Sequence, residues 1–248
     1  MQSTAYYDIA YSQHEIMNPL TERTLSEIGR AFLCTPSPAL LDIGSGKGYA
    51  AAVFAREFGA HCTLIEPWPR WNTAARDLFA RIGATDRLTI HERRAGPEDA
   101  RVEAFDVILC LGTTPVYGGF EAALNTLRPA LRKDGILIVG EATLDPPVPV
   151  GYRSYILRRG WDFLTSSRMI RCIASCGYDL LWCRRSTSEE WDAYMSLQWK
   201  AVREYALAHA GEPDARAFLA YARKEQLVYF RYQRRAMDWN VLVLAACG

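Results

Sequence analysis

The fold class of this chain is decided by the stretch LLDIGSGKGYAAAVFA, which runs from Leu40 to Ala55. A short apolar run carries one acid, Asp42, and leads into glycines at every second position, Gly44, Gly46 and Gly48. An alanine-rich run with helical composition follows. Glycines spaced this closely between a strand and a helix allow the backbone to approach a ligand. The stretch therefore predicts a strand, a ligand-binding turn and a helix.

The alternation of strand and helix continues along the rest of the chain. We expect strands over Ala39–Ile43, Cys62–Ile65, Leu88–His91, Phe105–Leu111, Gly135–Gly140, Tyr178–Cys183 and Asn240–Ala246. We expect helices over Pro19–Leu33, Gly48–Phe58, Trp71–Ile82, Phe120–Leu131, Phe163–Cys176, Ser188–His209 and Asp214–Glu225. Short strands joined by helices imply right-handed crossovers, so the pattern predicts an α/β protein whose parallel sheet is covered on both faces.

One domain accounts for this pattern, because no repeat, low-complexity tract or linker divides residues 1–248. We expect a helical segment over residues 1–35 before the sheet. A helical cap over about residues 185–236 interrupts the sheet before its last strand. Aromatic side chains are frequent in this cap, and most of them are expected to form its core.

Composition and charge are those of an ordinary soluble globular protein. Of the 248 residues, 50% are hydrophobic and 23% are charged, and the formal net charge is +1. This balance does not favour nucleic acid as a partner. The seven cysteines form no CxxC pair, so we expect a reducing compartment and no metal site. Because no signal-peptide pattern and no apolar run of about 18 residues occur, we expect a cytoplasmic protein that does not enter a membrane.

The spacing of the glycines separates two kinds of cofactor site. A dinucleotide-binding turn has the pattern GxGxxG, and in this chain Tyr49 stands where its third glycine is required. A phosphate-binding GxxxxGK[ST] loop is absent from the sequence. The observed pattern, D-x-G-x-G-x-G from Asp42 to Gly48, resembles motif I of class I S-adenosylmethionine-dependent methyltransferases.

Further motifs extend the resemblance over nearly the whole chain. They are His14 with Asn18-Pro19, then CLGTTPVYGGF, LIVGEA and SEEWDAYMSLQW, and they are similar to a bacterial group of small-molecule class I methyltransferases. The resemblance implies a Rossmann-like fold with a seven-stranded, mostly parallel sheet whose last strand is antiparallel. It also implies that S-adenosylmethionine is the cofactor and S-adenosylhomocysteine the product. The methyl group would pass to a small-molecule acceptor by in-line displacement.

The resemblance also assigns the residues that hold the cofactor. Asp42 would interact with the ammonium group, Glu66 would accept hydrogen bonds from the ribose hydroxyls, and apolar groups just after Glu66 would cover the adenine. The cofactor-binding residues expected are Asp42, Gly44, Ser45, Gly46, Gly48, Glu66, Pro67, Trp68, Ala95, Leu111 and Gly112. Arg94 stands where many relatives carry an acid for the adenine amino group. The alternatives are the backbone at Ala95 alone, or an acid from the pair Glu98 and Asp99.

Two residues are candidates for the chemistry. Glu141 follows the strand Gly135–Gly140, and ligands bind at the carboxyl ends of strands in open parallel sheets. His14 could reach over the site from the N-terminal segment. A structural role is the alternative for each, since a general base is needed only when the acceptor must lose a proton. The N-terminal segment and the cap are expected to roof an apolar pocket lined by Asn18, Tyr117, Trp191 and Tyr232.

Other functions share this cofactor motif. A nucleic-acid or protein methyltransferase would need a broad basic or extended groove, and cyclopropanation and aminopropyl transfer are other uses of the same cofactor. A non-catalytic module that binds S-adenosylmethionine is a further alternative. The acceptor, its reacting atom and the oligomeric state do not follow from the sequence.

Overall fold

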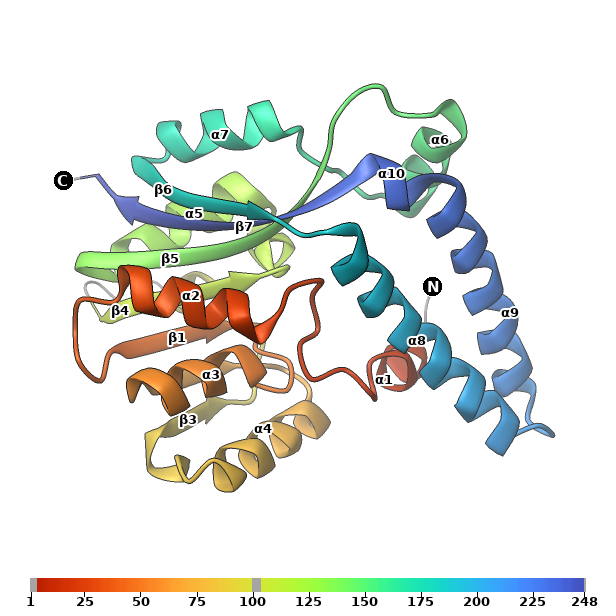
Figure 1. Cartoon of the computed structure of the whole chain (residues 1–248), viewed down its shortest axis with the longest axis horizontal. Coiled ribbons are helices and arrows are strands. Elements are labelled where there is room, and N and C mark those ends of the chain that lie inside the picture. Colours follow the sequence, from red (N-terminus) through yellow and green to blue (C-terminus); the bar gives the residue numbers. More distant parts are fainter. Residues whose placement is uncertain (1–3, 100–103, 248) are drawn as a thin grey trace.

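Seven strands form one sheet with helices on both faces in the computed structural model, which describes residues 4–99 and 104–247 (Figure 1). The strands are β1 (Ala39–Ile43), β2 (His61–Ile65), β3 (Leu88–His91), β4 (Phe105–Leu111), β5 (Leu131–Leu144), β6 (Tyr178–Arg185) and β7 (Met237–Ala246). Their order is β3-β2-β1-β4-β5-β7-β6. The last strand, β7, is antiparallel to both neighbours, and the other pairs are parallel. The predicted Rossmann-like sheet is confirmed.

The helices begin and end where local chemistry allows. They are α1 (Thr4–Ala10), α2 (Glu22–Phe32), α3 (Tyr49–Phe58), α4 (Pro69–Arg81), α5 (Phe120–Leu127), α6 (Val150–Arg159), α7 (Ser166–Ser175), α8 (Ser188–Ala208), α9 (Pro213–Val228) and α10 (Arg234–Ala236). The predicted helix Pro19–Leu33 begins only at Glu22, because the Thr21 hydroxyl caps it by accepting from the Thr24 N–H. Helix α1 lies in the expected helical segment 1–35 but was not predicted as a separate helix, and α6 was not expected from the sequence.

The largest boundary error lies between α5 and β5. The predicted helix Phe120–Leu131 ends at Leu127, and a 3₁₀ turn at Arg128–Ala130 follows because Pro129 cannot continue the helical hydrogen bonds. Strand β5 then starts at Leu131 and not at Gly135. Residues 132–135 bulge out of the pairing with β4, and Asp134 adopts a left-handed φ of 65° within this bulge.

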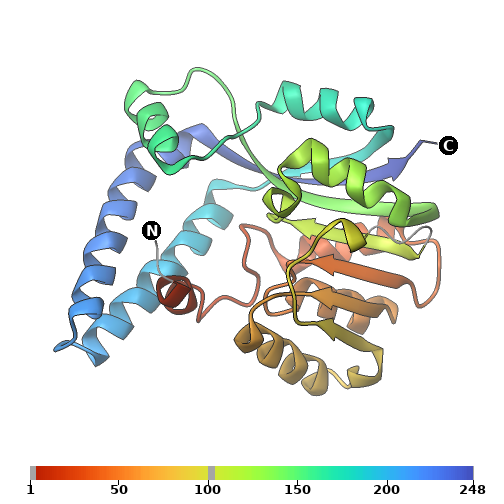
Figure 2. The same ribbon diagram turned by 180° about the vertical axis from the view of Figure 1, so that it is seen from behind.

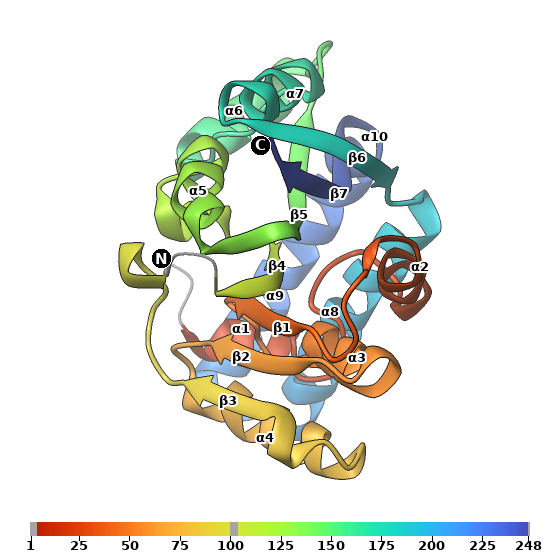
Figure 3. The same ribbon diagram turned by 90° about the vertical axis from the view of Figure 1, so that its left-hand side faces the viewer.

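The core lies in two layers, one on each face of the sheet. Leu40 and Leu41 point to opposite faces because side chains alternate along a strand. Leu40 belongs to the layer that contains Phe54 of α3, and Leu41 to the layer that contains Leu124 of α5 and Ile173 of α7. Figure 3 shows α5 on one side of the sheet and α2 and α3 on the other. No helix in the part of the chain described is long and apolar enough to cross a membrane.

Helices α8 and α9 follow β6 and precede β7 in the sequence. They form an antiparallel pair that projects from one end of the sheet (Figure 2). Helix α1 packs against α8, and its Tyr6 and Ala10 are buried with Val202 and Ala222. The N-terminal segment is therefore held against the cap.

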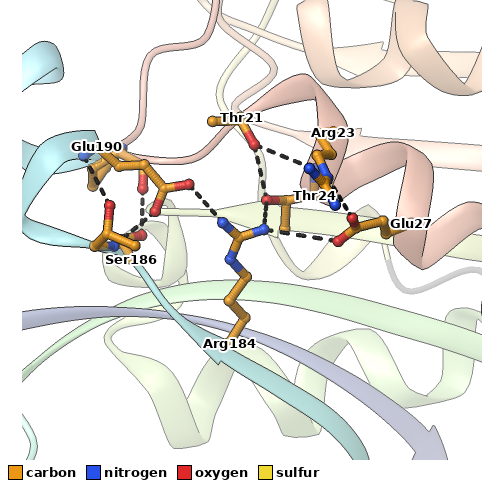
Figure 4. A network of polar contacts seen from close by, with 9 residues as sticks. Thr21, Arg23, Thr24, Glu27, Arg184, Ser186 and Glu190 are labelled. Atoms are coloured by element: carbon orange, nitrogen blue, oxygen red, sulfur yellow. Dashed lines mark hydrogen bonds and ion pairs between the residues drawn. The ribbon is translucent and has the colours of Figure 1, made fainter.

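Arg184, near the end of β6, fixes the base of the cap. Its guanidinium donates to the Thr24 hydroxyl (2.6 Å) and to Glu190 (2.9 Å), and lies 3.8 Å from Glu27 (Figure 4). Glu190 completes a capping box with Thr187 at the start of α8. The Arg184 contacts thus tie α2, β6 and α8 together.

Candidate functional site

The glycine turn after β1 has a backbone that other residues resist. Gly44, Gly46 and Gly48 have φ values of 61°, 55° and 71°, in the left-handed region. A Cβ atom on Gly44 would lie 2.4 Å from a methyl carbon of Thr113, and one on Gly46 would lie 2.7 Å from the Met17 sulfur. The turn therefore requires glycine for its conformation and for space.

A cavity of about 320 Å³ lies over this turn. Seven of the residues predicted for the site line it: Asn18, Asp42, Gly44, Ser45, Gly46, Leu111 and Gly112. We call it the turn cavity. Residues that the sequence reasoning missed complete its walls: Tyr11, Glu15, Ile16, Met17, Lys47, Tyr49, Ala50, Trp71, Thr113, Tyr194 and Trp239. Residues of the N-terminal segment and Tyr194 of α8 thus contribute to the walls of the turn cavity, whereas these regions were predicted to roof the acceptor pocket.

Two acids are buried beside the turn, and neither has a cationic partner within the part of the chain that the structure describes. Asp42 is buried, its Oδ2 has no hydrogen-bond partner among the described residues, and burial together with Glu66 raises its pKa to about 8. Glu66 accepts the Gly46 N–H (2.9 Å) and the Trp68 N–H (3.1 Å). Burial still raises the pKa of Glu66 to about 7. The two acids make this place suited to a cationic ligand.

Lys47 fastens the N-terminal segment to the glycine turn. Its ammonium group donates to the carbonyl oxygens of Tyr11, Ser12 and His14, each at 2.8 Å. Nearby, the Asn18 amide donates to the Leu111 carbonyl at 3.3 Å. The segment from Tyr11 to Asn18, which we call the strap, is therefore anchored at both ends.

The residues predicted to cover the adenine lie at the border of the turn cavity. Pro67 and Trp68 are half-buried at the start of α4, and Trp68 stacks on Trp71 with ring centroids 4.7 Å apart. Trp71 lines the cavity, whereas Glu66, Pro67 and Trp68 are outside the set of described residues that do so.

The loop after β3 contains the residues that were considered for contact with the adenine amino group. Ala95 packs against the core layer that contains Leu41, and Arg94 is exposed. Asp99 is buried and accepts from the Arg93 guanidinium and, at 2.7 Å, from the Gly96 N–H. These bonds use both carboxylate oxygens, so Asp99 holds the loop in shape.

A second cavity, of about 1000 Å³, lies beyond the end of β4 and against Glu141 and Ala142 of β5. We call it the large cavity. It shares Gly112 and Trp239 with the turn cavity. Glu141 lines it, accepts a hydrogen bond from the Thr114 hydroxyl (2.6 Å), and has its pKa raised by burial. The structure therefore brings Glu141 and Gly112 to neighbouring positions, as the sequence reasoning expected. Glu141 was predicted to follow its strand, but it lies within β5, because pairing with β7 continues this strand to Leu144.

Trp239 is the main residue that the sequence reasoning missed. A Cβ atom on Gly140 would lie 2.5 Å from its ring, and one on Gly112 would lie 2.9 Å from it. A glycine just after β4 and a glycine within β5 thus make room for the indole, and these two glycines were the signal available in the sequence. The segment Gly160–Leu164, with Trp161 and Phe163, also lines the large cavity and was not anticipated.

Several predicted residues line neither cavity among the residues described. His14 is buried, its Nε2 is 2.9 Å from the Tyr194 carbonyl oxygen, and burial lowers its pKa. Trp191 packs against the core, and its ring meets Tyr194 edge-on. These two side chains lie behind the walls of the cavities.

Tyr117 and Tyr232 also lie behind the walls. Tyr117 packs against the core layer on the α5 side, and its hydroxyl has no partner in the described part of the chain. Tyr232 stacks on Tyr152 with centroids 5.5 Å apart. No group of three or more His, Cys, Asp or Glu side chains within residues 4–99 and 104–247 is arranged to hold a metal ion.

The comparison with known families decides the family. A model of the methyltransferase domain matches residues 13–180. The chain belongs to this methyltransferase family. The match confirms the resemblance that the glycine pattern suggested.

Relatives match over the whole length. The uncharacterized protein YjhP of Escherichia coli (strain K12) is 30% identical, over 97% of each chain. The crystal structure of an S-adenosylmethionine-dependent methyltransferase from Geobacter sulfurreducens, in complex with S-adenosylhomocysteine, is 26% identical. It covers 99% of both chains with a TM-score of 0.87. A methyltransferase from Thiobacillus denitrificans, at 24% identity and a TM-score of 0.86, shares the fold.

Proposed function

We propose that this methyltransferase transfers a methyl group from S-adenosylmethionine to a small-molecule acceptor and releases S-adenosylhomocysteine. The observation that carries the proposal is the pair of adjoining cavities. One lies on the glycine turn beside two buried acids, the other ends at Glu141, and Gly112 and Trp239 belong to both. Such an arrangement suits two ligands that must meet at one point.

The residues around the turn fit the cofactor. The Oδ2 of Asp42, which has no partner among the described residues, would pair with the cofactor's ammonium group. Backbone at Gly44, Ser45, Gly46 and Gly48 would hold the methionine part, with Leu111 and Gly112 beside it. Glu66 would take the ribose hydroxyls, and Pro67, Trp68 and Ala95 the adenine. When bound, the cofactor supplies a methyl group on a positively charged sulfur.

The large cavity would take the acceptor. Its volume of about 1000 Å³ is at the upper end of small-molecule pockets and too small for a folded macromolecule. The strap and the aromatic walls exclude water, and the cavity holds the acceptor in line with the methyl group. Glu141, oriented by Thr114, takes a proton where the acceptor must lose one.

Of the other predicted residues, Asn18 borders the turn cavity. His14, Tyr117, Trp191 and Tyr232 line neither cavity among the described residues, so we assign them no contact with either ligand. The cysteines of the described chain are all free, which supports a reducing compartment such as the cytoplasm.

Binding and turnover test the proposal separately. In titration calorimetry, S-adenosylmethionine and S-adenosylhomocysteine should bind with micromolar affinity, and NAD should not bind. A metabolite library should then contain acceptors that cause S-adenosylhomocysteine to accumulate. Tight NAD binding without S-adenosylmethionine binding would overturn the cofactor. Cofactor binding with no turnover on any metabolite would favour a non-catalytic module.

A further inference from the structure

Most of the buried and half-buried acids of the described chain have an arginine as ion-pair partner. Each of the following buried or half-buried acids of the described chain forms an ion pair with an arginine: Asp8, Glu22, Glu27, Glu57, Asp99, Asp106, Glu190, Asp192, Glu225 and Asp238. Such pairing is the usual way to offset the loss of hydration of a buried carboxylate.

Three acids with similar burial have no arginine or lysine within ion-pair distance in the described chain: Asp42, Glu66 and Glu141. Asp42 and Glu66 belong to the proposed cofactor site, where the ligand itself is cationic. Glu141 is the only one of the three that lines the large cavity. If an acid without an arginine partner indicates a cationic ligand, then Glu141 indicates a cation in the large cavity.

The rest of the large cavity agrees with a cationic ligand. Its charged residues are Glu121, Glu141, Asp162 and Arg168, so negative charge predominates. Its aromatic rings come from Phe120, Trp161, Phe163 and Trp239. Aromatic faces attract cations through the negative charge above the ring.

The depth of these groups orders the site. Glu121, Asp162 and Arg168 are exposed and form the rim, whereas Thr114, Phe120 and Trp239 are buried. Glu141 stands at the inner end because it follows Gly140, whose carbonyl accepts from the Gly112 N–H (2.9 Å). The carboxylate thus lies beside the residues that also border the turn cavity.

We propose that the acceptor is an amine, bound with its nitrogen between Glu141 and Trp239 and its organic part along the aromatic walls. The inference rests on the proposed methyl transfer and names its substrate class. A protonated amine is not nucleophilic, so its proton first passes to the Glu141 carboxylate. The nitrogen lone pair then forms the bond to the methyl carbon while the carbon–sulfur bond breaks and its electron pair stays on sulfur.

A series of three probes with one frame and different charges tests the inference by binding alone. The probes are 2-phenylethylamine, 2-phenylethanol and phenylacetate, titrated at pH 7 into the protein saturated with S-adenosylhomocysteine. The ammonium probe should bind at least about tenfold more tightly than the alcohol, which corresponds to about 1.4 kcal/mol. Phenylacetate should bind most weakly. Equal affinities, including no millimolar binding by any probe, would overturn the inference.

Variants locate the preference. Glu141→Gln should lower the affinity for the ammonium probe about tenfold and leave that for the alcohol unchanged. Glu189→Gln, which removes an exposed acid at the start of α8, should change neither affinity. Unaltered S-adenosylhomocysteine affinity shows that each variant is folded. An ammonium preference that survives Glu141→Gln would overturn the assignment of the nitrogen to Glu141.

The two proposals fail in different ways. Loss of the methyltransferase proposal would appear as no binding of S-adenosylhomocysteine to the wild-type protein. Loss of the amine proposal would appear as normal S-adenosylhomocysteine binding with no preference for the ammonium probe. Where both proposals hold, an amine in the library that yields an N-methyl product, measured by mass spectrometry, would identify the acceptor.

Discussion

Asp42 carries a cost in the ligand-free protein that its position beside the cofactor explains. Burial raises the pKa of Asp42 from its ordinary value of 3.8 to about 8. The native state therefore holds a proton that the unfolded chain releases at lower pH. Between these two pH values the folded state binds more protons, so stability falls as the pH rises. A cationic ligand would offset this cost by pairing with the ionised carboxylate.

Replacing Asp42 by Asn should separate its effect on the stability of the fold from its effect on cofactor affinity. The Asp42→Asn variant lacks the titration, so its free energy of unfolding should fall less than that of the wild type from pH 5 to pH 8.5. At the same time S-adenosylmethionine should bind at least about tenfold more weakly, because a charge-assisted bond is lost. Urea unfolding at several pH values measures the first effect, and calorimetry the second. Parallel pH profiles for the two proteins would contradict the burial argument.

Glu66 gives a second test at the scale of one side chain. Glu66→Gln replaces one acceptor oxygen by an NH₂ donor, which must face a backbone N–H because the two carboxylate oxygens accept from Gly46 and Trp68. S-adenosylmethionine affinity should fall by about tenfold or more, since hydrogen bonds to a charged group contribute about 1.5–3 kcal/mol each. Glu189→Gln, at the exposed start of α8 and away from the cofactor site, is the matched control. Unchanged affinity in Glu66→Gln would leave Glu66 as a structural acid of the turn.

Among the elements, the strap is the one whose role sequence reasoning underestimated. His14 and Asn18 suggested a segment near the site, but helix α1 and the bonds of Lys47 did not follow from the sequence. Lys47 lies inside the glycine motif, and the sequence around it does not indicate which groups its side chain binds. Its three carbonyl partners lie in the strap just after α1, and only the folded chain brings them to Lys47.

Lys47→Met should loosen the strap without disturbing the sheet. The change removes three hydrogen bonds from a charged donor, so S-adenosylhomocysteine should dissociate about tenfold faster. Amides from Tyr11 to Asn18 should exchange with deuterium faster, while those of β1 and β4 should keep their protection. Lys224→Met on the exposed side of α9 serves as control. Stopped-flow displacement and exchange mass spectrometry provide the measurements, and an unchanged dissociation rate would mean that the strap does not retain the ligand.

Across the whole molecule, periodicity predicted the sheet well because strands and helices depend on local patterns. All seven strands occur where expected, with β2 and β6 one or two residues longer than predicted and β5 and β7 longer by more. The turn residues were also predicted, since the need for glycine is local. Residues brought from a distance were missed, among them Trp239, Met17 and Phe163. Their positions depend on how the strap, β7 and the segment after α6 pack around the two cavities.

Because Trp239 borders both cavities, the two ligands should influence each other. Filling the turn cavity fixes one side of the indole, so the cost of ordering it is already met when a second ligand enters the large cavity. S-adenosylhomocysteine should therefore strengthen the binding of 2-phenylethylamine, and the probe should strengthen S-adenosylhomocysteine binding by the same factor.

Trp161 lines only the large cavity, which makes it a matched comparison for Trp239. Trp239→Phe should reduce the coupling factor toward one, whereas Trp161→Phe should lower the affinity for the probe and leave the coupling factor intact. Calorimetry with each ligand in the presence and absence of the other measures both factors. Equal coupling in the two variants would mean that communication between the cavities does not pass through Trp239.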